Sequence, residues 1–378
     1  MSGRGNITRR GKSSWQIKYD LPRDAQTGER RVAYRTVRGK RAAAEQELTA
    51  ILGKLDRGLA VDPSKATVAE YLAEWLATTA PQRVAPKALE RYHGLVRNQI
   101  APHLGAIGLQ KLRPADVDRW IKGLIAEGKL STRSIRHAHG VLRAALNDAA
   151  AVELVERNVA SLIRAPKVDR QEIEILTADQ IADTLEKLRD HPSLFPIVAL
   201  ALGTGARRGE IAALRWSDVD LDGATVRIER ALEQTMAGLR VKQPKTAAGR
   251  RTITLPAFVV AALRDHRRKA LETRMALGAG ALPADWPVFG NHEGNWPTPY
   301  SISDRWRDAV KNRKLPKVTF HALRHSHASA LIAARLDVVA VSRRIGHASP
   351  ALTLSVYGHL FDPSDDKAAA AIDAAFGQ

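Results

Sequence analysis

The 378-residue sequence contains no cysteine, so disulfides, thiolate catalysis and thiolate zinc sites are all excluded. No run of eighteen apolar residues occurs, and we therefore expect no membrane-spanning helix. The basic first residues lack a following apolar segment, which argues against a secretory signal. These absences favour a cytoplasmic protein.

Acidic residues are also scarce relative to basic ones. The chain has 59 Lys and Arg against 40 Asp and Glu, a net charge of +19 and a pI of about 10.4. Such a balance favours a polyanionic partner, with nucleic acid first. A basic ribosome-associated protein fits the charge equally well. The length suggests two or three domains.

The segment from Phe320 to Tyr357 is rich in side chains that can take part in catalysis. It contains F-H-A-L-R-H-S-H-A-S, then I-G-H-A-S, and it ends in S-V-Y, which G-H follows. A guanidinium can bind two phosphate oxygens, imidazoles can hold or move protons, and a phenol can be a nucleophile. His321 and Arg324 are three residues apart in a run without Gly or Pro, so a helix would place them on one face. The pattern suits phosphate chemistry.

Here the sequence resembles the catalytic domain of the tyrosine recombinases, the phage integrase family. The resemblance is carried by H-A-L-R-H, by G-H, and by Tyr357 ten residues after His347. The segment T-G-A-R-R-G-E followed by L-R-W matches the family's first catalytic arginine at Arg207, and Q-P-K-T matches its lysine at Lys245. Lys242 is the rival lysine, which would more simply contact phosphate. The resemblance implies a six-residue catalytic set: Arg207, Lys245, His321, Arg324, His347 and Tyr357.

Two other interpretations fit parts of these motifs. His321 and His325 at i, i+4, with His327 nearby, could ligate a metal, although no H-E-x-x-H motif occurs. The glycines at 203–209 match a loose dinucleotide-binding pattern, but no series of βαβ units follows them. We expect neither a metal nor a cofactor.

The first 60 residues form a basic module. Twelve Lys or Arg stand against three acids in residues 1–41, a local net charge of +9. Alternating patterns predict strands over 14–20 and 31–37, and a helix over 40–55. This resembles the arm-type DNA-binding domain of phage integrases, with Arg31, Arg35 and Arg38 as candidate DNA contacts. A solvated basic sheet without a specific target is the alternative.

Residues 66–166 predict an all-helical domain of four or five helices. Thr67 can cap the first helix, and the others begin near Pro86, Pro114 and Ser131. The last has a basic face that includes Arg133 and Arg136, which are candidate DNA contacts. By its place in the chain this region resembles the family's core-binding domain.

Residues 172–378 predict a mixed, mainly helical catalytic domain with a small β-sheet. A capping box at Thr177–Gln180 opens a helix, and strands are predicted over 224–230 and 250–256. A long helix from Pro256 and a short terminal helix over 366–376 follow. The fold class is therefore α+β, mainly α.

The resemblance also implies a mechanism and partners. Tyr357 would attack a DNA phosphate and form a 3′-phosphotyrosyl bond, His321 would assist its deprotonation, His347 would hydrogen-bond the phosphate, and Lys245 would protonate the leaving oxygen. Partners would be double-stranded DNA at arm-type and core-type sites, a homotetramer, and a directionality factor or host DNA-bending protein. The alternatives are a chromosome-dimer resolvase, a transposon-encoded integrase, a type IB topoisomerase and a non-enzymatic DNA-binding protein.

Overall fold

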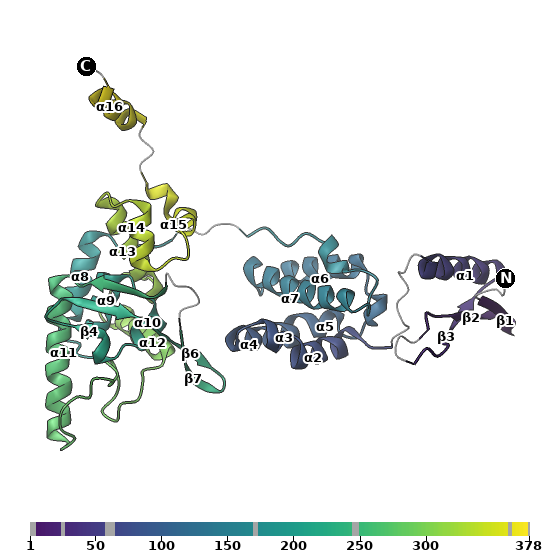
Figure 1. The fold of residues 1–378 in the computed structure, drawn as a ribbon, viewed down its shortest axis with the longest axis horizontal. Coiled ribbons are helices and arrows are strands. Elements are labelled where there is room, and N and C mark those ends of the chain that lie inside the picture. Colours follow the sequence, from purple (N-terminus) through teal and green to yellow (C-terminus); the bar gives the residue numbers. More distant parts are fainter. Residues whose placement is uncertain are drawn as a thin grey trace. The chain divides into compact units, whose positions relative to one another are not determined.

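The computed structural model describes residues 5–23, 27–56, 65–168, 173–243, 249–361 and 365–376. The chain divides into two compact units, Met1–Arg170 and Gln171–Gln378 (Figure 1). The second covers nearly the same residues as the predicted catalytic domain, 172–378. The first contains the predicted arm-type and core-binding regions. The linker predicted between them, Gly58–Lys65, lies outside the described residues except for Lys65. A separation into three domains therefore stays a prediction.

The N-terminal unit begins with an antiparallel sheet of order β1-β2-β3, formed by Gly5–Gly11, Ser14–Asp20 and Val32–Arg38. Helix α1 (Arg41–Asp56) packs on it around the buried side chains of Ile17, Ala33 and Ala44. The predicted strands and helix are confirmed to within a residue. Strand β1 was not predicted, because G-N-I-T-R-R-G contains one apolar side chain and hence no alternating pattern.

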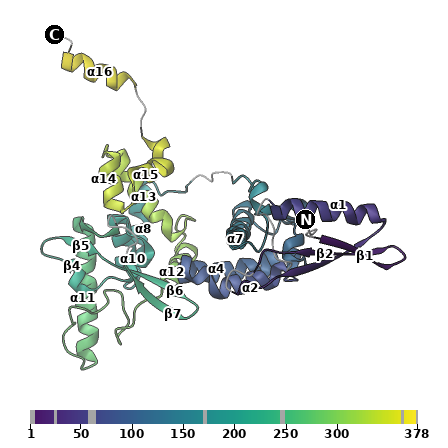
Figure 2. The same cartoon turned by 45° about the vertical axis from the view of Figure 1, so that its right-hand side comes forward.

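A helical region follows in the same unit (Figure 2). It contains α2 (Val68–Thr78), α3 (Ala80–Arg83), α4 (Pro86–Leu95), α5 (Ala101–Leu104), α6 (Pro114–Glu127) and α7 (Thr132–Ala151). The predicted cap is confirmed, since the Glu70 amide donates to Thr67 Oγ1 and the Thr67 amide donates back to Glu70. The helices share one apolar core that includes Leu72, Trp120 and Leu142. Ile125 is exposed because it stands at the edge of the apolar stripe in the last turn of α6.

The catalytic unit is built around α9 (Phe195–Thr204), an apolar helix buried on all sides. Helices α8 (Ala178–Leu188), α11 (Ala257–Ala276) and α13 (Phe320–Ala333) pack against it. A helix surrounded by protein can be apolar all round, which explains why its sequence shows no polar face.

A three-stranded antiparallel sheet of order β4-β5-β8 lies in this unit, formed by Val219–Asp220, Thr225–Ile228 and Arg251–Thr254. Strands β5 and β8 confirm the two predicted strands. The separate hairpin β6–β7 (Ala231–Thr235 and Gly238–Lys242) was not predicted. In this hairpin Leu232 is buried, whereas the alternating Leu239 and Val241 of β7 are exposed.

The remaining helices of this unit are α10 (Arg208–Ala212), α12 (Pro299–Asn312), α14 (Val338–Ile345), α15 (Pro350–Tyr357) and α16 (Asp365–Phe376). The predicted terminal helix is thus confirmed as α16. Helices α13, α14 and α15 share a small core that includes Ala328, Val341 and Tyr357. This core fixes the end of α15 against α13.

Candidate active site

Two tight turns bring the candidate residues together. Helix α9 ends at Gly205 with φ of 64°, and α14 ends at Gly346 with φ of 70°, a region that glycine occupies without strain. A Cβ on Gly205 would come within 2.7 Å of the His327 ring, and one on Gly346 within 2.7 Å of Arg251 Nη1. Both turns therefore need glycine for conformation, and the Gly205 turn also needs it for space.

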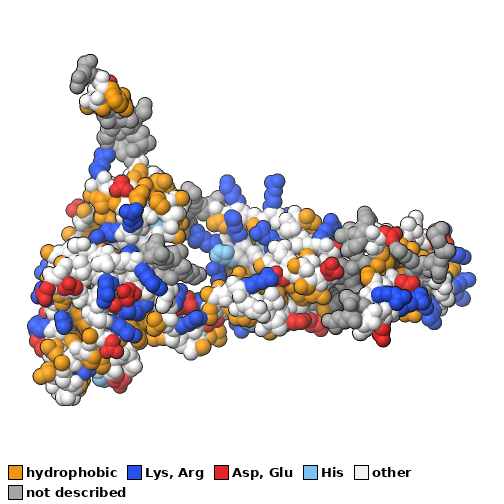
Figure 3. All heavy atoms as spheres, viewed as in Figure 1, with side chains coloured by type: hydrophobic (Ala, Val, Ile, Leu, Met, Phe, Trp, Pro, Cys, Tyr) orange, Lys and Arg blue, Asp and Glu red, His pale blue; other side chains and the backbone are white. Residues whose placement is uncertain are grey.

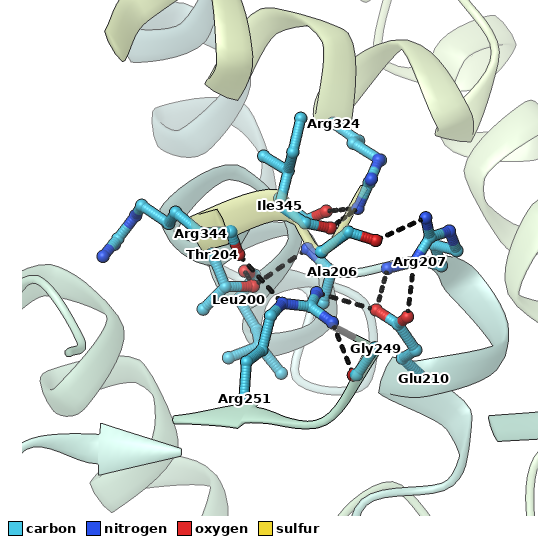
Figure 4. Close-up of polar contacts among 12 residues, drawn as sticks. Leu200, Thr204, Ala206, Arg207, Glu210, Gly249, Arg251, Arg324, Arg344 and Ile345 are labelled. Carbon is cyan, nitrogen blue, oxygen red and sulfur yellow. Dashed lines mark hydrogen bonds and ion pairs between the residues drawn. The ribbon is translucent and has the colours of Figure 1, made fainter. Parts of the chain in front are cut away.

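Arg324 lies at the centre of the site. Its side chain is buried, and Nη1 donates to the carbonyl oxygens of Gly205 and Ile345, each at 2.6 Å (Figure 4). Its Nη2 atom is also buried and has no hydrogen-bond partner among the described residues. Burial, together with the charge of Arg207, lowers the pKa of Arg324 to about 9, so the guanidinium remains charged at neutral pH. A buried cation with a free donor is suited to binding an anion.

Arg207 is held in place by ion pairs and hydrogen bonds. Its Nη1 lies 2.8 Å from Glu210 Oε1, and its Nη2 donates to the Gly346 carbonyl at 3.0 Å. Glu210 Oε2 is also 2.9 Å from Nη2 of Arg251, whose Nε donates to the Arg344 carbonyl (Figure 4). Burial would raise the pKa of Glu210, but Arg251 and Arg207 outweigh it and hold that pKa below its ordinary value. The carboxylate therefore stays ionised and orients Arg207.

Tyr357 ends α15 with its side chain buried. Its hydroxyl lies 2.6 Å from Nδ1 of His325, on α13. The His347 ring lies nearly parallel to the phenol with centroids 6.5 Å apart, and its Nδ1 is 2.9 Å from Thr353 Oγ1. Burial raises the pKa of Tyr357 to about 12, against the opposing charge of Arg324. The phenol is therefore protonated at rest.

His321 lies at the solvent-exposed edge of this group of residues. It lies in the first turn of α13 and is exposed, and its ring meets that of His325 edge-on with centroids 4.8 Å apart. It lines a cavity of about 760 Å³, whose basic members include Arg207, Arg208 and Lys317. Loss of surrounding water lowers the pKa of His321, and the charge of Arg324 adds to this. The cavity presents a concentration of positive charge beside the buried arginines.

Five of the six predicted catalytic residues thus meet around the Gly205 and Gly346 turns: Arg207, His321, Arg324, His347 and Tyr357. Lys245, the sixth, lies outside the described residues. Its rival Lys242 ends β7 with Nζ 2.7 Å from Glu233 Oε1, so that ammonium is paired within the hairpin.

Two residues of this site were not predicted from the sequence. Nothing in the sequence marks Arg251 as a site residue, because a charged side chain at the start of a short strand is ordinarily exposed. His325 was considered only as a metal ligand, although its place one turn after His321 on the same helix could have marked it. Among the described residues, no group of three or more His, Asp or Glu is positioned to hold a metal ion.

The candidate DNA contacts differ in their surroundings. Arg38, Arg133 and Arg136 are exposed. Arg35 is exposed but forms an ion pair with Glu47 at 2.9 Å, and Arg31 stands just before β3, half-buried. Figure 3 shows Lys and Arg side chains over the N-terminal sheet and the α7 region. Within the described part of the chain, no helix is long and apolar enough to cross a membrane.

Comparison with known proteins decides the family. The model of the phage integrase family matches residues 174–363, and that of the SAM-like N-terminal domain of phage integrases matches residues 67–125. An integrase of Streptomyces ambofaciens is 30% identical, with 88% of this chain and 86% of that protein covered. The chain belongs to the phage integrase family.

Other relatives of this integrase-family chain agree. A XerC-like tyrosine recombinase of Caldanaerobacter subterraneus is 25% identical over 95% of this chain and 96% of its own length. The fold is similar to that of the Tn1549 transposon integrase solved with transposon right end DNA, with a TM-score of 0.63, 21% identity, and 82% and 100% of the two chains covered. A lambda integrase dimer bound to a core site gives a TM-score of 0.59, 21% identity and 94% coverage of both chains. The predicted fold class and the assignment to the tyrosine site-specific recombinases are confirmed.

Proposed function

We propose that this recombinase cuts and rejoins DNA through a 3′-phosphotyrosyl bond at Tyr357, and thereby integrates and excises a phage or other mobile element. The observation that carries the proposal is a buried phenol that feels the charge of a buried guanidinium, whose Nη2 has no hydrogen-bond partner within the described part of the chain. These groups supply a nucleophile and a phosphate-binding donor within one site.

Arg207 and Arg324 bind the non-bridging oxygens of the scissile phosphate and stabilise the charge that builds in the transition state. His321 and His347 act beside them, the first assisting proton removal and the second hydrogen-bonding the phosphate. Thr353 orients His347 through the bond to its Nδ1. Lys245 protonates the 5′-oxygen that leaves.

The phosphotyrosyl bond retains the energy of the phosphodiester, so a 5′-hydroxyl of a partner DNA strand can attack it without ATP. The working assembly is a homotetramer on two duplexes in the cytoplasm of a bacterial host, with a directionality factor or host DNA-bending protein as further partners. Residues 1–60 bind arm-type DNA and residues 66–166 close over the core site, with the exposed basic residues named above contacting backbone.

The test is covalent trapping on a nicked core-site duplex, from which the cleaved fragment diffuses away. Wild-type protein should form an adduct whose mapped peptide carries DNA on Tyr357. Tyr357→Phe removes one hydroxyl and should abolish the adduct while DNA binding persists. Tyr92→Phe removes a hydroxyl from the helical region and should form the adduct normally. An adduct on any other residue would contradict the proposal.

A further inference from the structure

We propose that His325 accepts the proton of Tyr357 as the phenol attacks the scissile phosphate, a role that rests on the recombination function proposed above. Its Nδ1 lies 2.6 Å from the Tyr357 hydroxyl oxygen, within direct proton-transfer distance. His325 is absent from the six-residue set that the family resemblance supplied. Only the folded chain brings it to the nucleophile, across 32 residues of sequence.

The surroundings of the pair leave His325 able to accept a proton. Burial, together with the nearby His321 and Arg324, lowers the pKa of His325 to about 4. The imidazole is therefore neutral at pH 7, and one ring nitrogen carries a lone pair. A phenol is a donor toward such a nitrogen, so Nδ1 is the acceptor and Nε2 carries the hydrogen. The groups facing the pair are His321, His347 and Arg324.

His321 is placed differently. Its ring contacts the His325 ring edge-on, and among the described residues the hydrogen-bond partner of the Tyr357 hydroxyl is His325. His321 instead lines the basic cavity beside Arg207. The direct transfer therefore belongs to His325, and His321 acts on that ring or on the phosphate.

Tyr357 Oη forms a bond to phosphorus, and the bond from phosphorus to the 5′-oxygen breaks with its electron pair on that oxygen. The phenolic proton passes to His325 Nδ1, and the leaving oxygen takes a proton from the Lys245 ammonium. In rejoining, the 5′-oxygen of the incoming strand bonds to phosphorus and its hydroxyl proton passes to the neutral Lys245 amine. The bond from phosphorus to Tyr357 Oη breaks, and the imidazolium of His325 returns its proton to that oxygen.

The experiment compares His325→Asn with wild type in single-turnover cleavage of the nicked core-site duplex, with full-length protein. Asparagine can keep a hydrogen bond at the position of Nδ1 but has no basic nitrogen, so it separates orientation from proton acceptance. We expect cleavage to fall roughly 10²- to 10⁴-fold, the usual contribution of a positioned general base. His359→Asn, which changes an exposed histidine two residues after Tyr357, is the matched control and should cleave like wild type.

The pH profile distinguishes proton acceptance from a structural role. In His325→Asn the free phenolate must react, so the rate should rise about tenfold per pH unit between roughly pH 7 and 9, while the pH stays below the pKa of the phenol. Wild type should vary less, because His325 is deprotonated throughout this range. A substrate with sulfur as the bridging 5′ atom needs no proton on its leaving group. It should restore cleavage by Lys245→Ala and leave His325→Asn slow.

The outcomes separate the two proposals. Suppose that wild type forms the adduct. If His325→Asn then cleaves within about threefold of the wild-type rate, or if the two pH profiles are parallel, the role of His325 is overturned and the recombinase proposal stays intact. If His325→Asn cleaves faster than wild type, the hydrogen bond from Tyr357 to His325 restrains the nucleophile, and the role of His325 as proton acceptor is also overturned. Absence of any wild-type adduct would overturn both. DNA binding and thermal melting of His325→Asn confirm that the variant is folded.

Discussion

Arg251 and Glu210 form a buried ion pair, with Nη2 2.9 Å from Oε2 and side chains only 7% and 5% exposed. The pair joins β8 to α10, and the same carboxylate holds Arg207, which is part of the candidate active site. A largely buried residue thereby determines the position of one that must bind phosphate. This makes Arg251 a positioning residue for the reaction.

Arg251→Met should destabilise the catalytic unit by about 3–5 kcal/mol, because it leaves the Glu210 carboxylate buried with one partner fewer. The double variant Arg251→Met with Glu210→Gln should recover part of this loss, since the uncompensated charge is gone. Denaturant unfolding of the four proteins of this double-mutant cycle measures the coupling. Additive effects of the two substitutions would contradict a direct interaction.

Acid should weaken the same contact. The folded-state pKa of Glu210 lies below its ordinary value of 4.5, so its ionised form adds stability above that pH and loses it as the pH falls through the folded pKa. Glu210→Gln has no such titration. The difference in unfolding free energy between wild type and Glu210→Gln should therefore shrink from about pH 6 to about pH 3. A constant difference would show that the carboxylate does not titrate with folding.

Arg207→Lys and Arg324→Lys should each lower cleavage by roughly 10²–10³-fold, as for a lost transition-state donor, with little change in DNA affinity. Lysine keeps the charge but cannot donate two bonds from one plane. Arg189→Lys, an exposed arginine paired with Glu186, should behave like wild type. Equal losses in DNA binding and in cleavage would show that the two arginines bind DNA and do not act on the transition state. Wild-type cleavage should persist in EDTA, and sensitivity to the chelator would favour the metal interpretation.

Deletion of residues 1–60 should leave cleavage of a core site intact and abolish integration between two attachment sites. The reason is that the +9 charge of the first 41 residues lies in a module with its own apolar core, separate from that of the helical region. The isolated module should footprint away from the crossover point, with affinity that falls steeply as salt rises. Full integration by the truncated protein would show the module to be a solvated basic sheet.

Much of the architecture could be predicted from sequence because it depends on local chemistry. The caps at Thr67 and Thr177 and the apolar stripes of the helical region specify helices within a few turns of chain. The strands at 14–20 and 32–38 carry alternating patterns that a half-buried sheet requires. Strand β1 lacks such a pattern, and the alternating Leu239 and Val241 of β7 are exposed, so backbone pairing rather than side-chain burial defines these strands.

The chemical groups of the site were also present in the sequence, since Arg207, His321, Arg324, His347 and Tyr357 stand in motifs with fixed spacing. What spacing could not reveal is which imidazole meets Tyr357, because α13 and α15 are brought together by packing of their apolar faces. The same holds for Arg251, which reaches Glu210 across 41 residues. Sequence determines which groups are available, and tertiary packing decides their partners, because hydrogen bonds form between atoms that are close in space whatever their separation along the chain.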